Sequence, residues 1–452
     1  MIWKAILLSA ALAAMPLAGA AQPAADPAGD WISTVQVGAV RLRLALHLGP
    51  AASSFDSIDQ GALGLPAKMT HDGGHVVVTV DNVGVIEGDL SADGKTLTAQ
   101  LKQGPASTPL VFNRGAFTAA HRPQTPVKPY PYREEEVGYD NAARPGVHLA
   151  GTLTLPKGPG PFPAVLLITG SGAQDRDEAI FEHKPFLVLA DHLTRQGIAV
   201  LRVDDRNVGG STGATPGDTT LDFATDVEAG VGWLKRRKDI DPRRIGLIGH
   251  SEGGIIAPLV ASRDPSVAFI VLWAGQGVRG ADVIAGQLRA IALAAGAPPA
   301  AADHARDLQA KVMAALMSTP DATGSRAAID KVLAEAGAPP IADRDFAQIN
   351  SPWYRTYVAY DPAPALRSLR IPVLAVVGGK DVQVTAAQNV PALRAALVGD
   401  AKATVVELPG LNHMLQPAST GGVEEYGKIE TTIDPGALKL IGDWVVAETA
   451  RP

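Results

Sequence analysis

The segment 249–253, with the sequence Gly-His-Ser-Glu-Gly, carries the pattern most directly tied to chemistry. It follows the apolar run 245–248 and precedes 254–260, which is typical of a helix start. A nucleophilic serine on a sharp turn between strand and helix needs glycine two residues to either side, because side chains there would collide with both elements. We therefore predict that Ser251 is a nucleophile at the carboxyl edge of a sheet. The alternative is an ordinary glycine-rich turn, since the chain contains 47 glycines.

A serine hydroxyl is a weak nucleophile, so a base and an orienting acid are expected further along the chain. The apolar run 371–377 predicts a buried strand, and Asp381 lies just past its glycine end. The next predicted strand is 404–409, and His413 follows it in a loop. We predict that His413 takes the Ser251 proton while Asp381 holds the imidazole in the required tautomer. Taken singly, Asp381 is also interpretable as a helix N-cap, and His413 as a loop residue.

An acyl-transfer site also needs backbone N–H donors for the developing oxyanion. The continuous apolar run 164–169 predicts a strand, and the turn Gly-Ser-Gly-Ala follows it at 170–173. We assign the two donors to the amides of Ser171 and Glu252, with Gly172 as the alternative to Ser171. Because the donors are backbone groups, the side chain of Thr169 before the turn has little effect on this chemistry.

Three regions of different character carry these residues. In 30–114, apolar and polar residues alternate, as in 40–48, which predicts antiparallel strands of a small barrel or sandwich. Arg41, Arg43 and His47 on such a strand form either a ligand surface or a solvated face. Residues 115–132 hold four prolines and predict an extended linker. From 133 to 452, strands alternate with helices, which predicts an α/β domain with a mostly parallel sheet.

The alternation stops between the sixth and seventh predicted strands. Residues of about 275–369 are alanine-rich with a helical period, so we expect a helical cap over the site. Trp353, Tyr354 and Tyr357 lie near its end and are candidates for the substrate pocket. Packing of the cap on the core is the alternative role for these aromatic side chains.

The N-terminus and the composition bound the location and the partners. Residues 1–21 contain Lys4, an apolar run and a small-residue cleavage site, which predicts a secretory signal peptide and a periplasmic or secreted protein. An uncleaved membrane anchor is the alternative. The chain has no cysteine, a net charge of −6 and no basic stripe, so thiol chemistry is excluded and nucleic acid is not an expected partner. No metal-binding motif is present, and we expect neither a metal nor a cofactor.

The catalytic part resembles the α/β-hydrolase superfamily and, within it, the bacterial EstD-like carboxylesterases, which are related to serine aminopeptidase-like and S9-like hydrolases. The matching segments lie in 133–452, at 168–177, 249–254, 351–354, 379–384 and 410–413. The resemblance implies an α/β-hydrolase fold with a cap and cleavage of short-acyl esters. Where these relatives carry a small residue, Phe and Gln after the histidine, this chain has Met414, Leu415 and Gln416. Met414 is therefore a further candidate for the substrate pocket.

We therefore expect an exported, two-domain serine hydrolase that forms an acyl-enzyme with a small ester and does not insert stably in membranes. A serine peptidase of the same fold is one alternative. It would need an acidic group for the substrate amine, with candidates at Asp303, Asp307, Asp343 and Asp345. The other alternative is a cell-wall or glycan binding protein with a vestigial hydrolase, against which the complete Ser251, Asp381 and His413 set argues.

Overall fold

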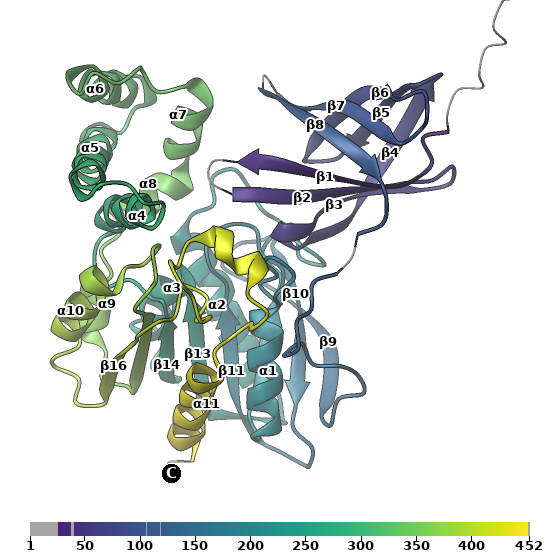
Figure 1. Cartoon of the computed structure of the whole chain (residues 1–452). Coiled ribbons are helices and arrows are strands. Elements are labelled where there is room, and N and C mark those ends of the chain that lie inside the picture. Colours follow the sequence, from purple (N-terminus) through teal and green to yellow (C-terminus); the bar gives the residue numbers. More distant parts are fainter. Residues whose placement is uncertain (1–25, 38–39, 105, 118, 451–452) are drawn as a thin grey trace, which may run out of the picture. The chain divides into compact units, whose positions relative to one another are not determined.

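The computed structural model describes residues 26–37, 40–104, 106–117 and 119–450. The expected signal peptide, residues 1–21, lies outside these described residues. The chain divides into two compact units (Figure 1). The first holds most of the N-terminal module through Phe117, and the second holds the remainder together with the short segments Gln36–Leu42 and Ser57–Ala62.

The N-terminal module is a closed barrel, in which β1 pairs with β8 to complete the circle. The period-two pattern has its expected effect, since Leu44, Leu46 and Leu48 of one strand are buried. His47, on the opposite face, lies between the carboxylates of Asp30 and Asp56, at 2.7 and 3.0 Å. The described strands of the barrel are β1 (Gly29–Val37), β2 (Val40–Leu48), β3 (Ser53–Ser57), β4 (Ala62–Asp72), β5 (His75–Val80), β6 (Gly84–Leu90), β7 (Thr96–Gln103) and β8 (Ala106–Arg114).

The second unit is built on a mixed sheet with the strand order β16-β15-β14-β13-β11-β12-β10-β9. The strands from β12 to β16 and β11 run parallel to one another, while β10 is antiparallel to both of its neighbours. Their bounds are β9 (Arg133–Asp140), β10 (His148–Leu155), β11 (Phe162–Ile168), β12 (Ala199–Val203), β13 (Ile240–His250), β14 (Val267–Trp273), β15 (Val373–Gly378) and β16 (Ala403–Leu408).

Helices cover both faces of this sheet, which explains why its strands are continuous apolar runs. Helices α1 (Pro185–Arg195) and α11 (Pro435–Thr449) pack on the face that holds Val165 and Leu167 of β11. Helices α2 (Thr220–Lys235), α3 (Gly253–Ala261) and α10 (Ala386–Ala396) pack on the other face, against Leu166 and Ile168. Both groups are visible around the sheet in Figure 1.

Between β14 and β15 the chain forms the helices of the cap, and this insertion has its own apolar cluster around Met313, Leu316 and Phe346. The cluster also includes Ile255 of α3, so the cap packs directly on the helix that follows the nucleophile turn. None of the helices in the described part of the chain is long and apolar enough to span a bilayer. The cap helices are α4 (Gly280–Ala294), α5 (Pro299–Ser318), α6 (Ala322–Glu335), α7 (Asp343–Ile349), α8 (Pro352–Ala359) and α9 (Ala363–Ser368).

The proline-rich segment expected as a linker differs from a free spacer from Arg122 onward. Arg122 donates to the carbonyl oxygens of Phe181, Gly427 and Ile429, at 2.7, 3.0 and 2.9 Å. Gln124 likewise donates to the Ile433 carbonyl at 2.7 Å. These two side chains bind backbone carbonyl groups far along the chain, so this part of the segment is held within the second unit.

Candidate active site

The turn between β13 and α3 holds Ser251 in a left-handed conformation, with φ of 53°. A side chain at Gly249 would place its Cβ 2.0 Å from the Gly253 carbonyl oxygen, and one at Gly253 would lie 2.3 Å from the Ile168 carbonyl oxygen. Only glycine fits at either position, so the spacing in the sequence reflects close backbone contacts on both sides of the turn. The strained serine is thereby directed out of the carboxyl edge of the sheet.

His413 and Asp381 lie together beyond the ends of β16 and β15. His413 Nδ1 donates to Asp381 Oδ2 at 2.8 Å, and both side chains are buried. The other oxygen, Asp381 Oδ1, accepts from the amides of Gln383 and Val384, each at 2.8 Å. Three donors thus fix the carboxylate, and the carboxylate fixes the tautomer of the imidazole, which leaves His413 Nε2 as a proton acceptor.

Ser251 and His413 line the same cleft, which has a volume of about 280 Å³. The three predicted pocket residues, Trp353, Tyr354 and Met414, also line it. Tyr357 does so as well, and its ring stacks on that of Trp353 at 5.6 Å. Ser171 lies on the cleft too, whereas Asp381 is behind His413, and Gly172 and Glu252 line a neighbouring cavity.

The turn after β11 passes directly beside the serine. A methyl group at Gly170 would lie 3.3 Å from the Cβ of Ser251, which is a tight contact. Gly172 has φ of 102°, which turns the chain sharply after Ser171. This turn and the N-terminus of α3, which carry the candidate oxyanion donors Ser171 and Glu252, both lie next to Ser251.

The side chain of Glu252 connects four elements, a role that the sequence did not reveal. Its Oε1 accepts from Thr220 Oγ1 of α2 at 2.6 Å and from Trp353 Nε1 of α8 at 2.9 Å. The Ser171 side chain is a third partner, from the turn after β11. Burial raises the pKa of this carboxyl above its ordinary range, although the hydrogen bonds from these three side chains oppose the shift. Glu252 thus ties the cap and the turn after β11 to the residue next to the nucleophile.

A second unpredicted pair, Glu178 and His250, lies behind the nucleophile. Glu178 Oε1 accepts from His250 Nδ1 at 2.8 Å and from the amide of Gly170 at 2.7 Å. His250 Nε2 faces the backbone carbonyl of His413 at 3.4 Å, and the two imidazole rings are 4.7 Å apart. Burial lowers the pKa of His250, but the charge and hydrogen bond of Glu178 outweigh it, so the pKa is raised overall. The pair holds the backbone on both sides of the serine.

The sequence gives little indication that the carboxylates of Glu178 and Glu252 support the site. Glu178 has φ of 52°, in an irregular segment between β11 and α1, and is 72 residues from its partner histidine. The available signal is chemical: Glu252 is an acidic residue directly after Ser251 in a tight turn, where a buried carboxylate needs hydrogen-bond donors. Within the described residues, no group of three or more potential ligands is arranged to bind a metal ion.

Comparison with known proteins assigns this architecture to a family. Residues 145–405, which include the nucleophile turn and Asp381, match the family described as X-Pro dipeptidyl-peptidase (S15 family). The chain belongs to the S15 family. It is therefore a hydrolase, which agrees with the resemblance of its motifs to those of α/β-hydrolases.

The individual relatives described below share less than 30% sequence identity with this S15 hydrolase. It is similar to Esterase EstD of Thermotoga maritima, with 28% identity over 300 residues, which are 66% of this chain and 65% of that protein. The chain thus spans about two thirds of that relative's length. Among solved structures, the Pyrococcus furiosus esterase Pf2001 matches with 14% identity and a TM-score of 0.43, over 74% of this chain and 98% of its own. The 2,6-dihydroxy-pseudo-oxynicotine hydrolase matches with 17% identity and the same TM-score, over 71% and 68% of the two chains.

Proposed function

We propose that this S15 hydrolase is a serine carboxylesterase that works through an acyl-enzyme. The observation that carries the proposal is the cleft in which Ser251 and His413 lie together, with Asp381 bonded to His413 at 2.8 Å. His413 Nε2 accepts the Ser251 proton as Oγ attacks the ester carbonyl, and the amides of Ser171 and Glu252 stabilise the tetrahedral oxyanion. His413 then protonates the departing alcohol, and water cleaves the acyl-enzyme by the same route in reverse.

The charges around the cleft favour an ester over a peptide with a free amino terminus. A peptidase of that kind needs an acidic side chain to bind the substrate ammonium. Among the described residues that line the cleft, the carboxylate is Glu178, which is buried. Its Oε1 accepts from His250 and Gly170 and its Oε2 has no hydrogen-bond partner, while its charge raises the pKa of the adjacent His250. The acids proposed in the cap do not line the cleft, and each pairs with an arginine: Asp303, Asp307, Asp343 and Asp345.

The peptidase alternative keeps one specific support, which is the name of the matched family. Purified enzyme should therefore be assayed with p-nitrophenyl acetate and with Gly-Pro-p-nitroanilide under the same conditions. We expect the ester to be cleaved at least 100-fold more efficiently than the anilide, as kcat/KM relative to the uncatalysed rate of each. The reverse order would reject the esterase proposal and leave the serine mechanism standing.

The serine mechanism has its own test. A fluorophosphonate should label the wild-type enzyme at Ser251, and Ser251→Ala should lose labelling and roughly 10⁴–10⁶-fold in kcat. The matched control is Ser262→Ala, at the end of α3, whose hydroxyl donates to the Leu259 carbonyl away from the cleft. Ester hydrolysis by Ser251→Ala at more than a few per cent of the wild-type rate would reject the nucleophile.

We also propose that the enzyme is exported, on the strength of the signal-like residues 1–21. Expression of the full chain in a Gram-negative host, followed by N-terminal sequencing of the periplasmic fraction, tests this directly. We expect a mature N-terminus close to residue 22. Full-length protein confined to the cytosol or the membrane fraction would reject export.

A further inference from the structure

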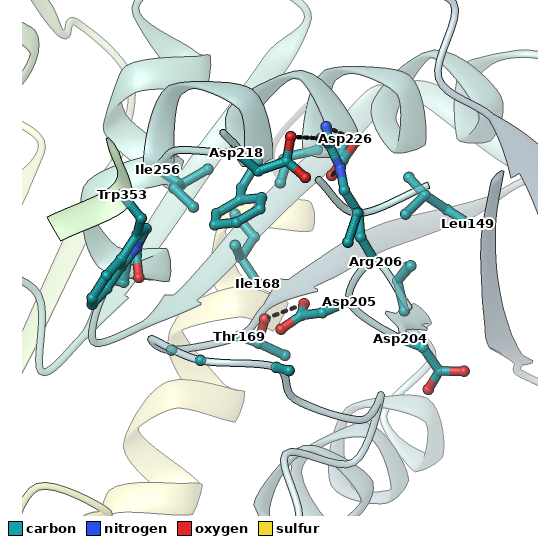
Figure 2. Close-up of a pocket in the computed structure, with 18 of the residues that line it drawn as sticks. Leu149, Ile168, Thr169, Asp204, Asp205, Arg206, Asp218, Asp226, Ile256 and Trp353 are labelled. Carbon is teal, nitrogen blue, oxygen red and sulfur yellow. Dashed lines mark hydrogen bonds and ion pairs between the residues drawn. The ribbon is translucent and has the colours of Figure 1, made fainter. Parts of the chain in front are cut away.

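A second cavity lies beside the catalytic cleft, on the α2 and α3 face of the sheet. It has a volume of about 360 Å³ and is formed within the second unit. Figure 2 shows Trp353 at one side of it and Leu149 and Arg206 at the opposite side, with Ile168 and Ile256 along the wall. Phe223 and Val227 of α2 also line it, so most of the side chains around the space are apolar.

The charged groups on this lining are already engaged. Asp205 accepts from Thr169 Oγ1 at 2.7 Å, an interaction drawn in Figure 2, and burial raises its pKa to about 8, so it is largely uncharged at neutral pH. The other ion pairs and hydrogen bonds of the lining are Asp204 with Arg176, Arg206 with Asp218 and Asp226, and Glu252 with Thr220 and Trp353. A charged ligand would have to compete with these partners, whereas an apolar group would displace none of them.

The cavity and the catalytic cleft are adjacent, since Gly170 and Trp353 line both. The cavity also reaches Glu252, whose amide is a proposed oxyanion donor, and Gly172, next to the other donor Ser171. His413 lines the cleft and not the cavity. In the tetrahedral intermediate the leaving oxygen must face His413 to receive its proton. The acyl chain must therefore point away from His413, past the oxyanion donors.

We propose that this second cavity binds the alkyl or aryl tail of the substrate's acyl group, so that the enzyme prefers medium-length acyl esters. This inference rests on the serine esterase function proposed above and assigns its substrate class. A space of 360 Å³ holds roughly ten to twelve heavy atoms at liquid density. An octanoyl chain, with its carbonyl at Ser251, fits within that limit. The acyl chains that the cavity accommodates are longer than the short acyl groups that the family resemblance implies.

The test is a chain-length series of p-nitrophenyl esters from acetate to decanoate, assayed below their micellar concentrations. In the wild-type enzyme we expect kcat/KM to rise at least tenfold from acetate to octanoate, since each buried methylene strengthens binding roughly fourfold. Two variants fill the cavity from different elements: Val227→Phe on α2, and Ala214→Phe on the loop before α2. Each should lower the octanoate-to-acetate ratio of kcat/KM at least tenfold. The matched control, Val398→Phe at an 85% exposed position, should leave the ratio unchanged.

Each outcome decides between the proposals. If the wild-type enzyme cleaves the acetate ester but kcat/KM falls steadily with chain length, the acyl cavity is overturned and the esterase function stands. This result holds even if both filling variants fail to fold, because it needs the wild-type enzyme alone. A preference for octanoate that both folded variants retain also overturns the cavity, because the tail must then bind elsewhere. No hydrolysis of any ester, with no fluorophosphonate labelling, rejects the esterase function and the cavity together.

Discussion

Removal of the Glu178 carboxylate is the perturbation for which the structure gives the most specific expectation. In Glu178→Ala, two donors lose their acceptor, His250 Nδ1 and the Gly170 amide, which lie 2.8 and 2.7 Å from Glu178 Oε1. A donor left unsatisfied in a buried site costs about 1–3 kcal/mol. The free energy of unfolding should therefore fall by about 2–6 kcal/mol. Glu178→Gln keeps an acceptor oxygen and loses only the charge, so its loss should be about 1–2 kcal/mol.

The pH dependence separates the charge from the shape of this side chain. Glu178 raises the pKa of His250 in the folded protein, so the folded state holds a proton that the unfolded state releases near pH 6.5. The stabilisation is fully present below pH 6.5 and is lost as the pH rises through the raised pKa of His250. The stability difference between wild type and Glu178→Gln should therefore be largest at pH 5.5–6.5 and shrink toward pH 9.

Urea unfolding at pH 6 and pH 9 measures these differences, and kcat with p-nitrophenyl acetate reports on the site. Because the pair fixes the backbone of Gly170 and His413, we expect Glu178→Ala to lower kcat on the order of tenfold or more, with a smaller effect on KM. A double-mutant cycle with His250→Ala should give a coupling energy above about 1 kcal/mol at pH 6. The proposed role of the pair would be refuted if each single variant had a free energy of unfolding within about 0.5 kcal/mol of the wild-type value and the cycle showed no coupling.

Three further variants test the surroundings of the site. Asp381→Asn should retain its fold but lose on the order of 10³–10⁴-fold in kcat, because the amide permits the wrong His413 tautomer; a loss below tenfold would contradict the role of Asp381. Thr220→Val should remove about 1–3 kcal/mol from the free energy of unfolding, because buried Glu252 loses its 2.6 Å donor, and equal stability of the variant in urea would contradict that contact. The pKa of Asp205 is raised to about 8 in the folded state, so wild-type stability should fall by on the order of 5 kcal/mol as the pH rises from 4 to 8, whereas Asp205→Asn should lack that slope when unfolding is followed across this range.

The elements that carry the site could be predicted because their signals are local. The glycines at 249 and 253 follow from contacts within one strand–turn–helix unit, and continuous apolar runs mark strands that are buried on both faces. Residues at the carboxyl ends of neighbouring parallel strands necessarily share one edge of the sheet. The sequence could therefore place Asp381 and His413 near Ser251 from their positions after β15 and β16 alone, and the structure brings these three residues together.

The supporting contacts could not be predicted because they join residues far apart in the chain. Glu252 is 101 residues from Trp353, and Glu178 is 72 residues from His250. Each pair depends on how a loop or a cap helix packs on the sheet, which no local periodicity encodes. The second cavity is of the same kind, since its walls come from the ends of β11 and β12, from α2 and α3, and from the cap. The sequence predicts Trp353 as an aromatic side chain of the cap, but it does not predict that this side chain lines both the cleft and the second cavity.

The three buried carboxylates near Ser251 fix different parts of the site. Asp381 acts on the base, Glu178 on the backbone of the turn after β11, and Glu252 on the cap and on Ser171. The structure therefore predicts that their effects differ in kind. Loss of Asp381 should change the rate of proton transfer for every substrate alike, because its partners, His413 and the amides of Gln383 and Val384, do not line the second cavity. Loss of the Glu252 side chain frees Trp353, so it should alter the discrimination between acyl chains more than the rate with acetate. A chain-length series with Glu252→Ala against Asp381→Asn measures this difference, and an identical profile in both variants would contradict the separation of roles.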